Sequence, residues 1–478
     1  MVERQGESAV VLYPSPGIGH LVSTVELGKL ILDHQPSFSV TILITTVPFN
    51  TGSTAPYISR VSAETPSINF HHLPLVTLPQ DSSSFEDINF GIPRRNNPDV
   101  RQVLESIAQK SKIRAFLIDF FCNAAFEVST SLNIPTYYFY TSGASGLSNF
   151  LYLTTIDKTI NKSLKDLNDY IHPPGTPPIF GSNFPKPLLD RDSSSYNNFI
   201  ATAAQMPKAC GIIANTFETL EPRAVKAIAD GLCVIDGATP PVYYVGPLIS
   251  TTNTSGDEHE CLNWLNSQPS TSVVFLCFGS IGSFDKEQLN DMAIGLEKSG
   301  QRFLWVVRTP PTEDQTKRFL TPPEPDLNAI LPRGFLDRTK DRGLVVKSWA
   351  PQMAVLNHHS VGGFVTHCGW NSVLEAVCAG VPMLTWPLYA EQKMNKVYLV
   401  EELKLALPLD ESEKGFVSAA ELEKRVRELM ESERGKAVRE NVLAMRDASK
   451  AATAAGGCSR AASERLTTLW KQDKVNGS

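Results

Sequence analysis

The first half of the chain alternates short apolar runs with segments of helical periodicity. Residues 8–16 and 37–46 each have the length and composition of a buried strand. The segment between them, 20–34, has helical spacing, carried by Leu21, Val25, Gly28 and Leu32. A second helical stretch is bracketed by apolar runs at 113–121 and 135–141. Repeated βαβ units of this kind predict a parallel, doubly wound sheet.

The alternation stops near 236–260 and then restarts. That segment contains three prolines, three glycines and a polar tail, which predicts a linker. After it come two further strands and the helix between them, at 272–280, 285–300 and 302–308. The Pro-rich stretch 309–332 is predicted to be a surface loop. We therefore predict an N-terminal domain over 1–245 and a second doubly wound domain over 246–455.

A helix is also predicted near the end of the second domain. Ser418 and Glu421 have the spacing of a capping box, and the apolar positions that follow lie on one helical side. The charges over 421–446 are interpreted as the solvated face of that helix.

This pattern predicts an α/β fold of two facing, doubly wound Rossmann-like domains. Open parallel sheets bind ligands at the carboxyl ends of their strands, where the strand order reverses. Two facing sheets would place the active site in the cleft between the domains. Residues that follow strands are therefore the candidates for chemistry.

Composition narrows the class of protein. The chain has 478 residues, 42% hydrophobic and 20% charged, with a net charge of -6, which disfavours a nucleic-acid partner. No apolar stretch approaches the roughly 20 residues of a membrane span. The eight cysteines form no C-x-x-C pair and are expected to be buried thiols in a reducing compartment. Without a signal-peptide pattern at the N-terminus, we expect a cytoplasmic protein and no membrane span.

Residues 362–382 concentrate polar and aromatic side chains at the start of a predicted helix. The strand 361–366 is followed by a turn and by a helix from residue 370, so the turn residues lie at a helix N-terminus, which favours anions. Glu375 lies one turn beyond Asn371, where a carboxylate would suit the hydroxyls of a ribose. Side-chain hydrogen-bond donors are offered by His367, Asn371 and Ser372, and Gly369 allows a ligand to approach the backbone closely. The alternative is a capped helix without a ligand, which does not explain His367, Trp370 and Glu375 together.

The flanking segments extend this candidate site. Trp349 offers a flat face for a base, and Glu391 and Gln392 follow the strand 381–386, where they would suit sugar hydroxyls. The unbroken stretch from Trp349 to Gln392 resembles the signature box of the plant family 1 UDP-dependent glycosyltransferases, and the resemblance covers essentially the whole chain. Within that family it is similar to the flavonoid and phenolic glucosyltransferase branch.

The resemblance implies a UDP-sugar site and a GT-B type fold. Trp349 would stack on uracil and the backbone of Ala350 would pair with its edge, while Gln352 and Glu375 would hold the ribose. The diphosphate would be held by Ser280, His367, Asn371 and Ser372. The sugar would be held by Thr141, Trp370, Glu391 and Gln392, and a glutamine at 392 goes with glucose in the family. A C-terminal helix over 456–478 would pack back on the N-terminal domain.

Two residues in the first domain are candidates for proton transfer. His20 begins the helix after the turn PSPGIGH, and Asp119 ends the strand AFLID. A neutral His20 could take a proton from an acceptor hydroxyl, with Asp119 fixing its tautomer. Taken singly, His20 is equally well interpreted as a solvated helix-cap histidine, and Asp119 is better interpreted as a strand-end surface or capping carboxylate. The resemblance implies that the two form a catalytic dyad. The GxG of the turn is incomplete as a nicotinamide fingerprint.

The acceptor pocket is expected in the first domain near His20. Apolar and aromatic candidates for its lining are Ile18, Phe120, Phe121, Phe150 and Tyr152, any of which could instead be core. Asp190 and Asp192 superficially resemble the metal-binding Asp-x-Asp of a different glycosyltransferase fold, and we interpret them as loop residues. We therefore expect no metal and no cofactor beyond the UDP-glucose co-substrate.

The predicted function is inverting transfer of glucose from UDP-glucose to a small phenolic acceptor, with His20 as general base. The expected partners are the phenolic acceptor and the UDP-sugar, and we expect a monomer. Transfer to carbon or nitrogen remains open, as do a UDP-sugar epimerase or hydrolase and a non-catalytic UDP-sugar-binding protein on the same fold. An aromatic acceptor pocket would distinguish the transferase from the epimerase or hydrolase.

Overall fold

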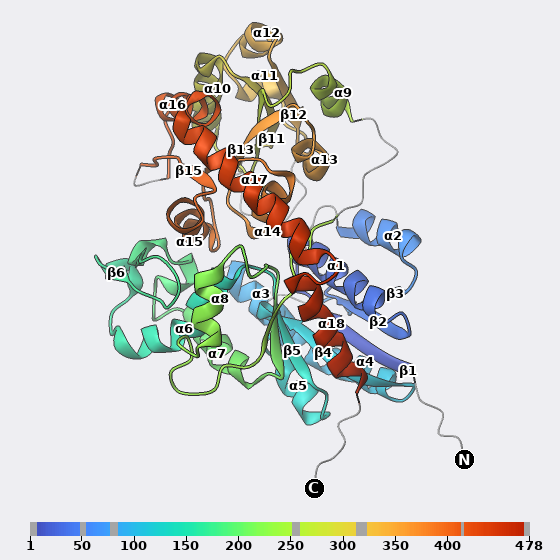
Figure 1. Cartoon of the computed structure of the whole chain (residues 1–478). Coiled ribbons are helices and arrows are strands. Elements are labelled where there is room, and N and C mark those ends of the chain that lie inside the picture. The colour runs from blue at the N-terminus through green and yellow to red at the C-terminus, as the bar shows by residue number, and fades with distance from the viewer. Residues whose placement is uncertain are drawn as a thin grey trace. The chain divides into compact units, whose positions relative to one another are not determined.

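The computed structural model describes residues 7–47, 54–76, 85–250, 259–311, 323–412 and 415–472. The chain divides into two compact units, one of residues 1–249 with 451–478 and one of residues 250–450. Both are α/β structures in which helices cover a parallel sheet (Figure 1).

The first unit contains, within its described residues, a seven-stranded sheet of order β3-β2-β1-β4-β5-β8-β9, in which every adjacent pair is parallel. The strands are β1 (Glu7–Tyr13), β2 (Phe38–Ile44), β3 (Ile68–His72), β4 (Ser111–Asp119), β5 (Thr136–Tyr140), β8 (Gly211–Ala214) and β9 (Val242–Tyr244). The strand order reverses between β1 and β4, which makes their carboxyl ends the topological switch point.

Helices α1 to α8 and the C-terminal α18 belong to this unit. Their bounds are α1 (Ile18–His34), α2 (Thr54–Glu64), α3 (Phe85–Arg95), α4 (Asn97–Ala108), α5 (Ala125–Ser131), α6 (Ala144–Thr159), α7 (Ser194–Gln205), α8 (Pro222–Ala229) and α18 (Cys458–Lys471). A small antiparallel pair, β6 (Tyr170–Ile171) and β7 (Ile179–Phe180), stands apart from the main sheet. The apolar sides of β1, β2, β4 and α1 share one core with Leu466 and Trp470 of α18.

The second unit has the same winding around a six-stranded parallel sheet, again within the described residues, of order β12-β11-β10-β13-β14-β15. The strands are β10 (Val273–Cys277), β11 (Arg302–Val307), β12 (Gly343–Lys347), β13 (Val361–Thr366), β14 (Met383–Thr385) and β15 (Ala406–Pro408). Here the order reverses between β10 and β13. All five residues of β10 and all six of β13 are buried, as expected for strands covered on both faces.

Most helices of the second unit lie between successive strands, whereas α9 precedes β10 and both α16 and α17 follow β15. They are α9 (Glu260–Asn266), α10 (Lys286–Ser299), α11 (Leu327–Ile330), α12 (Phe335–Thr339), α13 (Gln352–Leu356), α14 (Trp370–Ala379), α15 (Gln392–Val397), α16 (Ala419–Glu431) and α17 (Glu433–Thr453). Helix α17 runs across the boundary between the units at residue 450. The predicted α/β fold of doubly wound sheets is confirmed.

Several local predictions need correction. The segment 236–260, predicted to be a linker, contains the edge strand β9, which pairs with β8; residues 251–258 lie outside the described part of the chain. The predicted loop 309–332 includes α11, while residues 312–322 are likewise outside the description. Not every cysteine is buried, because Cys210 is exposed.

The capping box predicted at α16 forms only in part. The Ser418 side chain accepts from the Glu421 backbone N–H, as a cap should. The Glu421 carboxylate instead accepts from Arg425 at 2.6 Å and from the Asp410 backbone N–H at 3.1 Å. Arg425 is itself buried, so the charges of this helix do not all lie on a solvated face.

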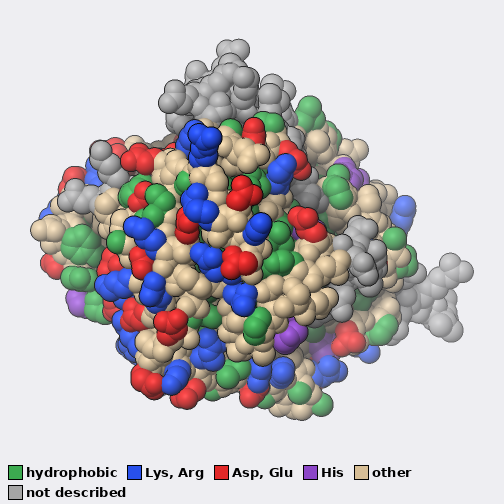
Figure 2. Space-filling model, turned by 90° about the horizontal axis from the view of Figure 1, so that it is seen from above, with side chains coloured by type: hydrophobic (Ala, Val, Ile, Leu, Met, Phe, Trp, Pro, Cys, Tyr) green, Lys and Arg blue, Asp and Glu red, His purple; other side chains and the backbone are tan. Residues whose placement is uncertain are grey.

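Charged side chains of both signs are interspersed over the face shown in Figure 2. Among the described residues, no helix has the length and apolar character needed to cross a membrane.

Candidate active site

His20 and Asp119 meet at the switch point of the first sheet. β1 and β4 are adjacent, so the turn after β1 and the end of β4 lie side by side. His20 Nδ1 lies 2.8 Å from Asp119 Oδ2, and the Ser15 hydroxyl donates to Asp119 Oδ1 at 2.5 Å. The Asp119 side chain is 1% exposed, whereas that of His20 is 32% exposed. A buried carboxylate held by two donors therefore orients a histidine that solvent and ligands can reach.

The local sequence explains how His20 reaches this place. Gly17 has φ 123°, a conformation that side chains disfavour, and it lets the chain turn from β1 directly into α1. Thr141, directly after β5, places its hydroxyl 3.2 Å from His20 Nδ1. With the Nδ1 proton directed at Asp119, the lone pair of a neutral ring lies on Nε2. The structure thus brings together the predicted residues His20, Asp119 and Thr141.

Ser15 and Glu221 take part in this arrangement and were not predicted. Glu221 is 2% exposed, and its carboxylate accepts from the Ala144 and Ser145 backbone N–H groups at 2.8 Å each. The Thr216 hydroxyl donates to it as well, at 2.5 Å. A carboxylate at the N-terminus of α6 satisfies free N–H groups and the helix dipole, and so fixes the turn that carries Thr141. Its sequence neighbourhood is polar and contains two other charges, Glu218 and Arg223, so nothing in the sequence singles out Glu221 or reveals its partner.

Aromatic side chains form a cluster next to His20. The Phe121 ring lies 6.2 Å from the His20 ring, edge to face, and 4.5 Å from Phe120. Phe150 lies 5.0 Å from Phe120, which joins it to the same cluster. Phe90 and Phe199, which were not predicted, contact these rings from α3 and α7. Phe120 and Phe121 are partly exposed, whereas the other three are buried.

The structure gives the two remaining lining candidates, Tyr152 and Ile18, other neighbours than the aromatic cluster. Tyr152, two positions after Phe150 on α6, points to another side of the helix and lines a separate hollow of about 310 Å³ with Ile156 and Tyr170. Ile18 packs against the core of the first unit. The helical period of 3.6 residues separates Phe150 from Tyr152, because positions two apart face away from each other.

His367 lies at the switch point of the second sheet, between two glycines. A Cβ atom built on Gly279 would come within 2.6 Å of His367 Nε2, and one on Gly369 within 2.4 Å. The ring is 6% exposed, and its Nδ1 has no hydrogen-bond partner among the described residues. Burial lowers the pKa of His367 to about 4, so the ring is neutral at neutral pH. A buried ring nitrogen without a protein partner is rare, and near a helix N-terminus it is a candidate contact for a bound ligand.

The first turn of α14 continues this site. Ser372 is buried, and its hydroxyl accepts from Gln352 Nε2 at 2.9 Å. The same nitrogen donates to Glu375 Oε2 at 2.5 Å, which joins α13 to α14. Burial raises the pKa of Glu375 to about 7, and the Gln352 donation acts in the opposite direction. Trp370 is buried and Asn371 half-buried on the same turn.

The remaining predicted residues follow β10, β12 and β14. Trp349 is 56% exposed and contacts His259 edge to face, whereas Ala350 is buried. Gln392 is 2% exposed, and its side-chain oxygen accepts from the Leu388 and Tyr389 backbone N–H groups at 2.8 and 3.0 Å. The half-buried Glu391 precedes it, and Ser280 is exposed after β10.

Asn395, which was not predicted from the sequence, connects the turn before α14 with the start of α15. Its side-chain amide donates to the Cys368 carbonyl at 2.9 Å and to Glu391 Oε1 at 3.4 Å. Ser348, Cys368 and Ala390 each have a positive φ, between 53° and 65°. A left-handed backbone conformation at a non-glycine residue persists only where the surrounding structure enforces it, and such residues are often found at functional sites. Here it shapes the three turns that present the candidate residues.

No group of three or more His, Cys, Asp or Glu side chains within the described ranges is arranged to hold a metal ion. Asp190, part of the superficial Asp-x-Asp, follows a 3-10 turn (Lys186–Leu188) and pairs with Lys165 at 2.6 Å, and donation from Lys165 lowers its pKa.

Comparison with known proteins identifies the family. Residues 238–450 match the family model described as "UDP-glucoronosyl and UDP-glucosyl transferase". UDP-glycosyltransferase 88B1 of Stevia rebaudiana is 57% identical over 97% of this chain and 99% of its own length. The chain belongs to the plant family 1 UDP-glycosyltransferases. The anthocyanidin 5,3-O-glucosyltransferase of a Rosa hybrid cultivar is 53% identical over 98% of this chain and 100% of its own. The predicted family and enzyme class are confirmed.

Solved structures of plant UDP-glycosyltransferases have the same fold. UGT2 of Phytolacca americana, solved with UDP-2-fluoro-glucose and pterostilbene, is 38% identical with a TM-score of 0.87, covering 97% of this chain and 100% of that one. UGT71G1 of Medicago truncatula, solved with UDP-glucose, is 32% identical with a TM-score of 0.84, covering 99% and 100%. The predicted GT-B type is confirmed by these neighbours.

Glu375 should make the stability of this UDP-glycosyltransferase depend on pH. A carboxyl group whose pKa is raised on folding stabilises the folded state below its unfolded pKa and loses that contribution as pH rises through the folded value. For Glu375 the loss should fall between about 4.5 and about 7. The permanently neutral E375Q should therefore be more stable than the wild type at pH 8 by up to about 3 kcal/mol, and nearly equal at pH 4.5. Urea unfolding of the ligand-free protein at both pH values measures this.

E297Q provides the control with the opposite sign. The Arg338 side chain lowers the pKa of Glu297, so the ionised carboxylate stabilises the folded state above its unfolded pKa. Because the pair lies near the surface, E297Q should lose only about 0.2–1 kcal/mol at pH 8. Equal stability of E375Q and the wild type at pH 8 would contradict the assignment of a half-buried carboxylate whose ionised form destabilises the folded state.

Proposed function

We propose that this UDP-glycosyltransferase transfers glucose from UDP-glucose to a hydroxyl of a flavonoid or chalcone-type phenol, with inversion and with His20 as general base. The placement of His20, held by a buried carboxylate and flanked by partly exposed aromatic rings, carries this proposal. The phloretin 2'-O-glucosyltransferase of Malus domestica, 50% identical over 94% of this chain and 97% of its own, supports the acceptor class.

The pair can perform the proton transfer that the reaction requires. As the acceptor oxygen bonds to the anomeric carbon, His20 Nε2 takes the hydroxyl proton and Asp119 stabilises the resulting imidazolium. The bond from the anomeric carbon to the diphosphate oxygen breaks, and UDP leaves with both electrons. A single displacement at the α-linked donor gives a β-glucoside. A positioned base of this kind contributes about 10²–10⁴-fold.

The donor is proposed to bind along the second sheet's strand ends. Trp349 would stack on uracil beside the Ala350 backbone, and Gln352 and Glu375 would receive the ribose. The neutral His367 ring would donate to the diphosphate together with the start of α14. The full set proposed for the diphosphate and sugar is Ser280, His367, Asn371, Ser372, Thr141, Trp370, Glu391 and Gln392.

The direct test is product formation from UDP-glucose with a panel of flavonoids, chalcones, stilbenes and simple phenols. We expect a β-glucoside, identified by NMR of the anomeric proton, and UDP in equal amount. An α-glucoside would contradict inversion. UDP release that does not depend on acceptor would instead indicate hydrolysis, and a carbon-linked product would contradict transfer to oxygen.

Phe121 should contribute to acceptor binding. Stacking between its ring and a flat phenol adds to the burial of apolar area, so F121A should raise the KM for the preferred phenol roughly tenfold, with a smaller change in kcat. Initial rates at varied acceptor and saturating UDP-glucose measure this split.

Tyr152 supplies the matched aromatic control. It lies on α6 in the separate hollow, so Y152A should change the acceptor KM by less than about twofold. An effect of Y152A equal to that of F121A would indicate that the acceptor binds elsewhere or that both variants act through stability.

A further inference from the structure

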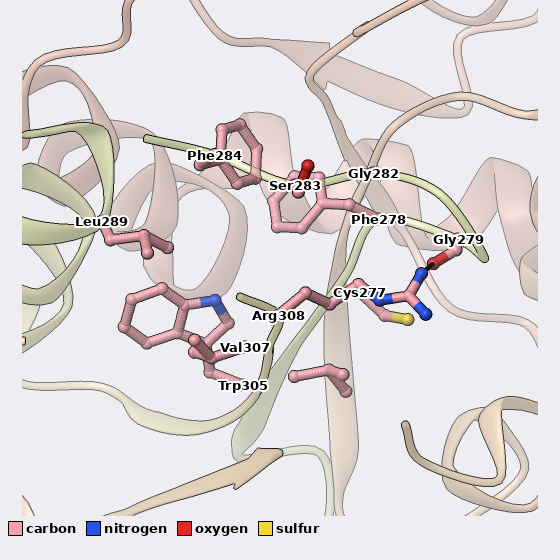
Figure 3. A pocket seen from close by; sticks show the side chains of 11 residues that line it. Cys277, Phe278, Gly279, Gly282, Ser283, Phe284, Leu289, Trp305, Val307 and Arg308 are labelled. Carbon is pink, nitrogen blue, oxygen red and sulfur yellow. Dashed lines mark hydrogen bonds between the residues drawn. The ribbon is translucent and has the colours of Figure 1, made fainter. Parts of the chain in front are cut away.

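Arg308 follows β11 and contacts the turn after β10. Its Nη1 donates to the Gly279 carbonyl at 3.2 Å and also to the Ser280 carbonyl. Figure 3 shows the guanidinium beside Gly279, with the hydrogen bond drawn. The side chain thus reaches from the end of β11 to the turn after β10, which borders the switch point between β10 and β13.

The charge of this guanidinium has no counter-charge in the described part of the chain. Its hydrogen-bond partners are two neutral carbonyls, and burial lowers its pKa. Arg425 in the same unit shows the usual arrangement, because it ion-pairs with Glu421, Glu428 and Asp410. Partial burial of a cation without an anion costs free energy, which a bound anion would offset.

The surroundings of Arg308 are those of the proposed diphosphate site. Gly279, whose carbonyl it contacts, also packs against the His367 ring. His367 is neutral when the site is empty, since burial lowers its pKa to about 4. Lys347, at the end of the neighbouring β12, is paired with Glu324 at 3.3 Å. Arg308 is therefore the cation best placed to offset the charge of an anion bound at Gly279 and His367.

We infer that Arg308 is a positioning and electrostatic residue for the diphosphate of the sugar donor, acting through the Gly279–Ser280 turn. This rests on the proposed donor site. By binding the two carbonyls, the guanidinium keeps them directed away from the ligand and leaves Ser280 and the backbone N–H groups to face the phosphates. Its positive charge favours the negative charge that grows on UDP as the bond to glucose breaks.

Calorimetric titration with UDP and with uridine distinguishes a loss of charge attraction to the diphosphate from a general disturbance of the site. Only UDP carries the diphosphate, so only its binding should depend on the Arg308 charge. R308Q keeps an amide donor for the carbonyls but removes the charge, whereas R308K keeps the charge. We expect R308Q to weaken UDP binding about 10- to 100-fold and uridine binding less than about threefold. R308K should retain most of the preference for UDP. R302Q, at the opposite end of β11, is the matched control and should behave as the wild type.

Three outcomes would overturn the inference. Equal losses for UDP and uridine in R308Q would assign Arg308 to the structure of the turn alone. Full UDP affinity in R308Q would leave it without a role in binding. A loss of UDP preference in R308K as large as that in R308Q would show that the fork geometry matters and the charge does not. A wild type that binds UDP no better than uridine would instead reject the proposed diphosphate site itself.

Discussion

H20A should lower kcat with the preferred phenol by about 10²–10⁴-fold while leaving UDP binding within about twofold of the wild type. The acceptor hydroxyl is a poor nucleophile until its proton is removed, and His20 is the histidine held by the buried Asp119. D119N should produce a similar loss, because the amide no longer stabilises the imidazolium. The double variant should lose little more than H20A, since the two residues act as one unit.

H34A on the same helix is the control. His34 lies in the last turn of α1 and contacts the Ser463 hydroxyl at 2.8 Å, so its removal tests helix integrity without touching the base. We expect H34A to keep nearly full kcat. Steady-state rates together with UDP calorimetry on each variant give the comparison. An H20A variant within tenfold of the wild type, or one that also loses UDP binding, would contradict the general-base role.

Regular, long elements could be predicted from the sequence because their periodicity is strong. β13 was predicted with its bounds, α14 with its first residue, and α1 to within two residues at either end. β9 was missed because its three residues, which lie between proline-containing turns, are too few to show a periodic pattern. Only their pairing with β8 makes them a strand. Arg425 was assigned to a solvated face because nothing in the helical pattern reveals acidic partners such as Asp410, which lies outside that helix.

The candidate donor residues were predictable because most of them follow one another within one stretch of chain. His367, Ser372 and Glu375 belong to one turn and the helix that it starts. The acceptor side is assembled from distant segments. Ser15, Phe90 and Phe199 come from three places in the sequence, and only the folded chain brings them near Asp119 and Phe121. Tyr152 was chosen with Phe150 for its aromatic ring, and the helix separates the two.

W470A should destabilise the first unit by about 3–5 kcal/mol, a large part of the stability of an ordinary domain. Trp470 near the end of α18 is 3% exposed and lies 5.4 Å from Tyr137 of β5, edge to face. It belongs to the core shared with β1, β2 and α1. Because this core is completed by residues from the far end of the chain, truncating the ring leaves a cavity that the sheet itself cannot fill.

Leu469, the preceding residue, is 48% exposed and supplies the matched control, since L469A removes an apolar side chain from the same helix without opening a cavity. Hydrogen exchange should show early loss of protection in β4, β5 and β9 of W470A, with β10 and β13 unchanged, because the stability lost belongs to one unit. L469A should keep the wild-type pattern. Loss of protection in β10 and β13 to the same degree would mean that the two units unfold together, and that α18 stabilises the whole chain rather than the first core.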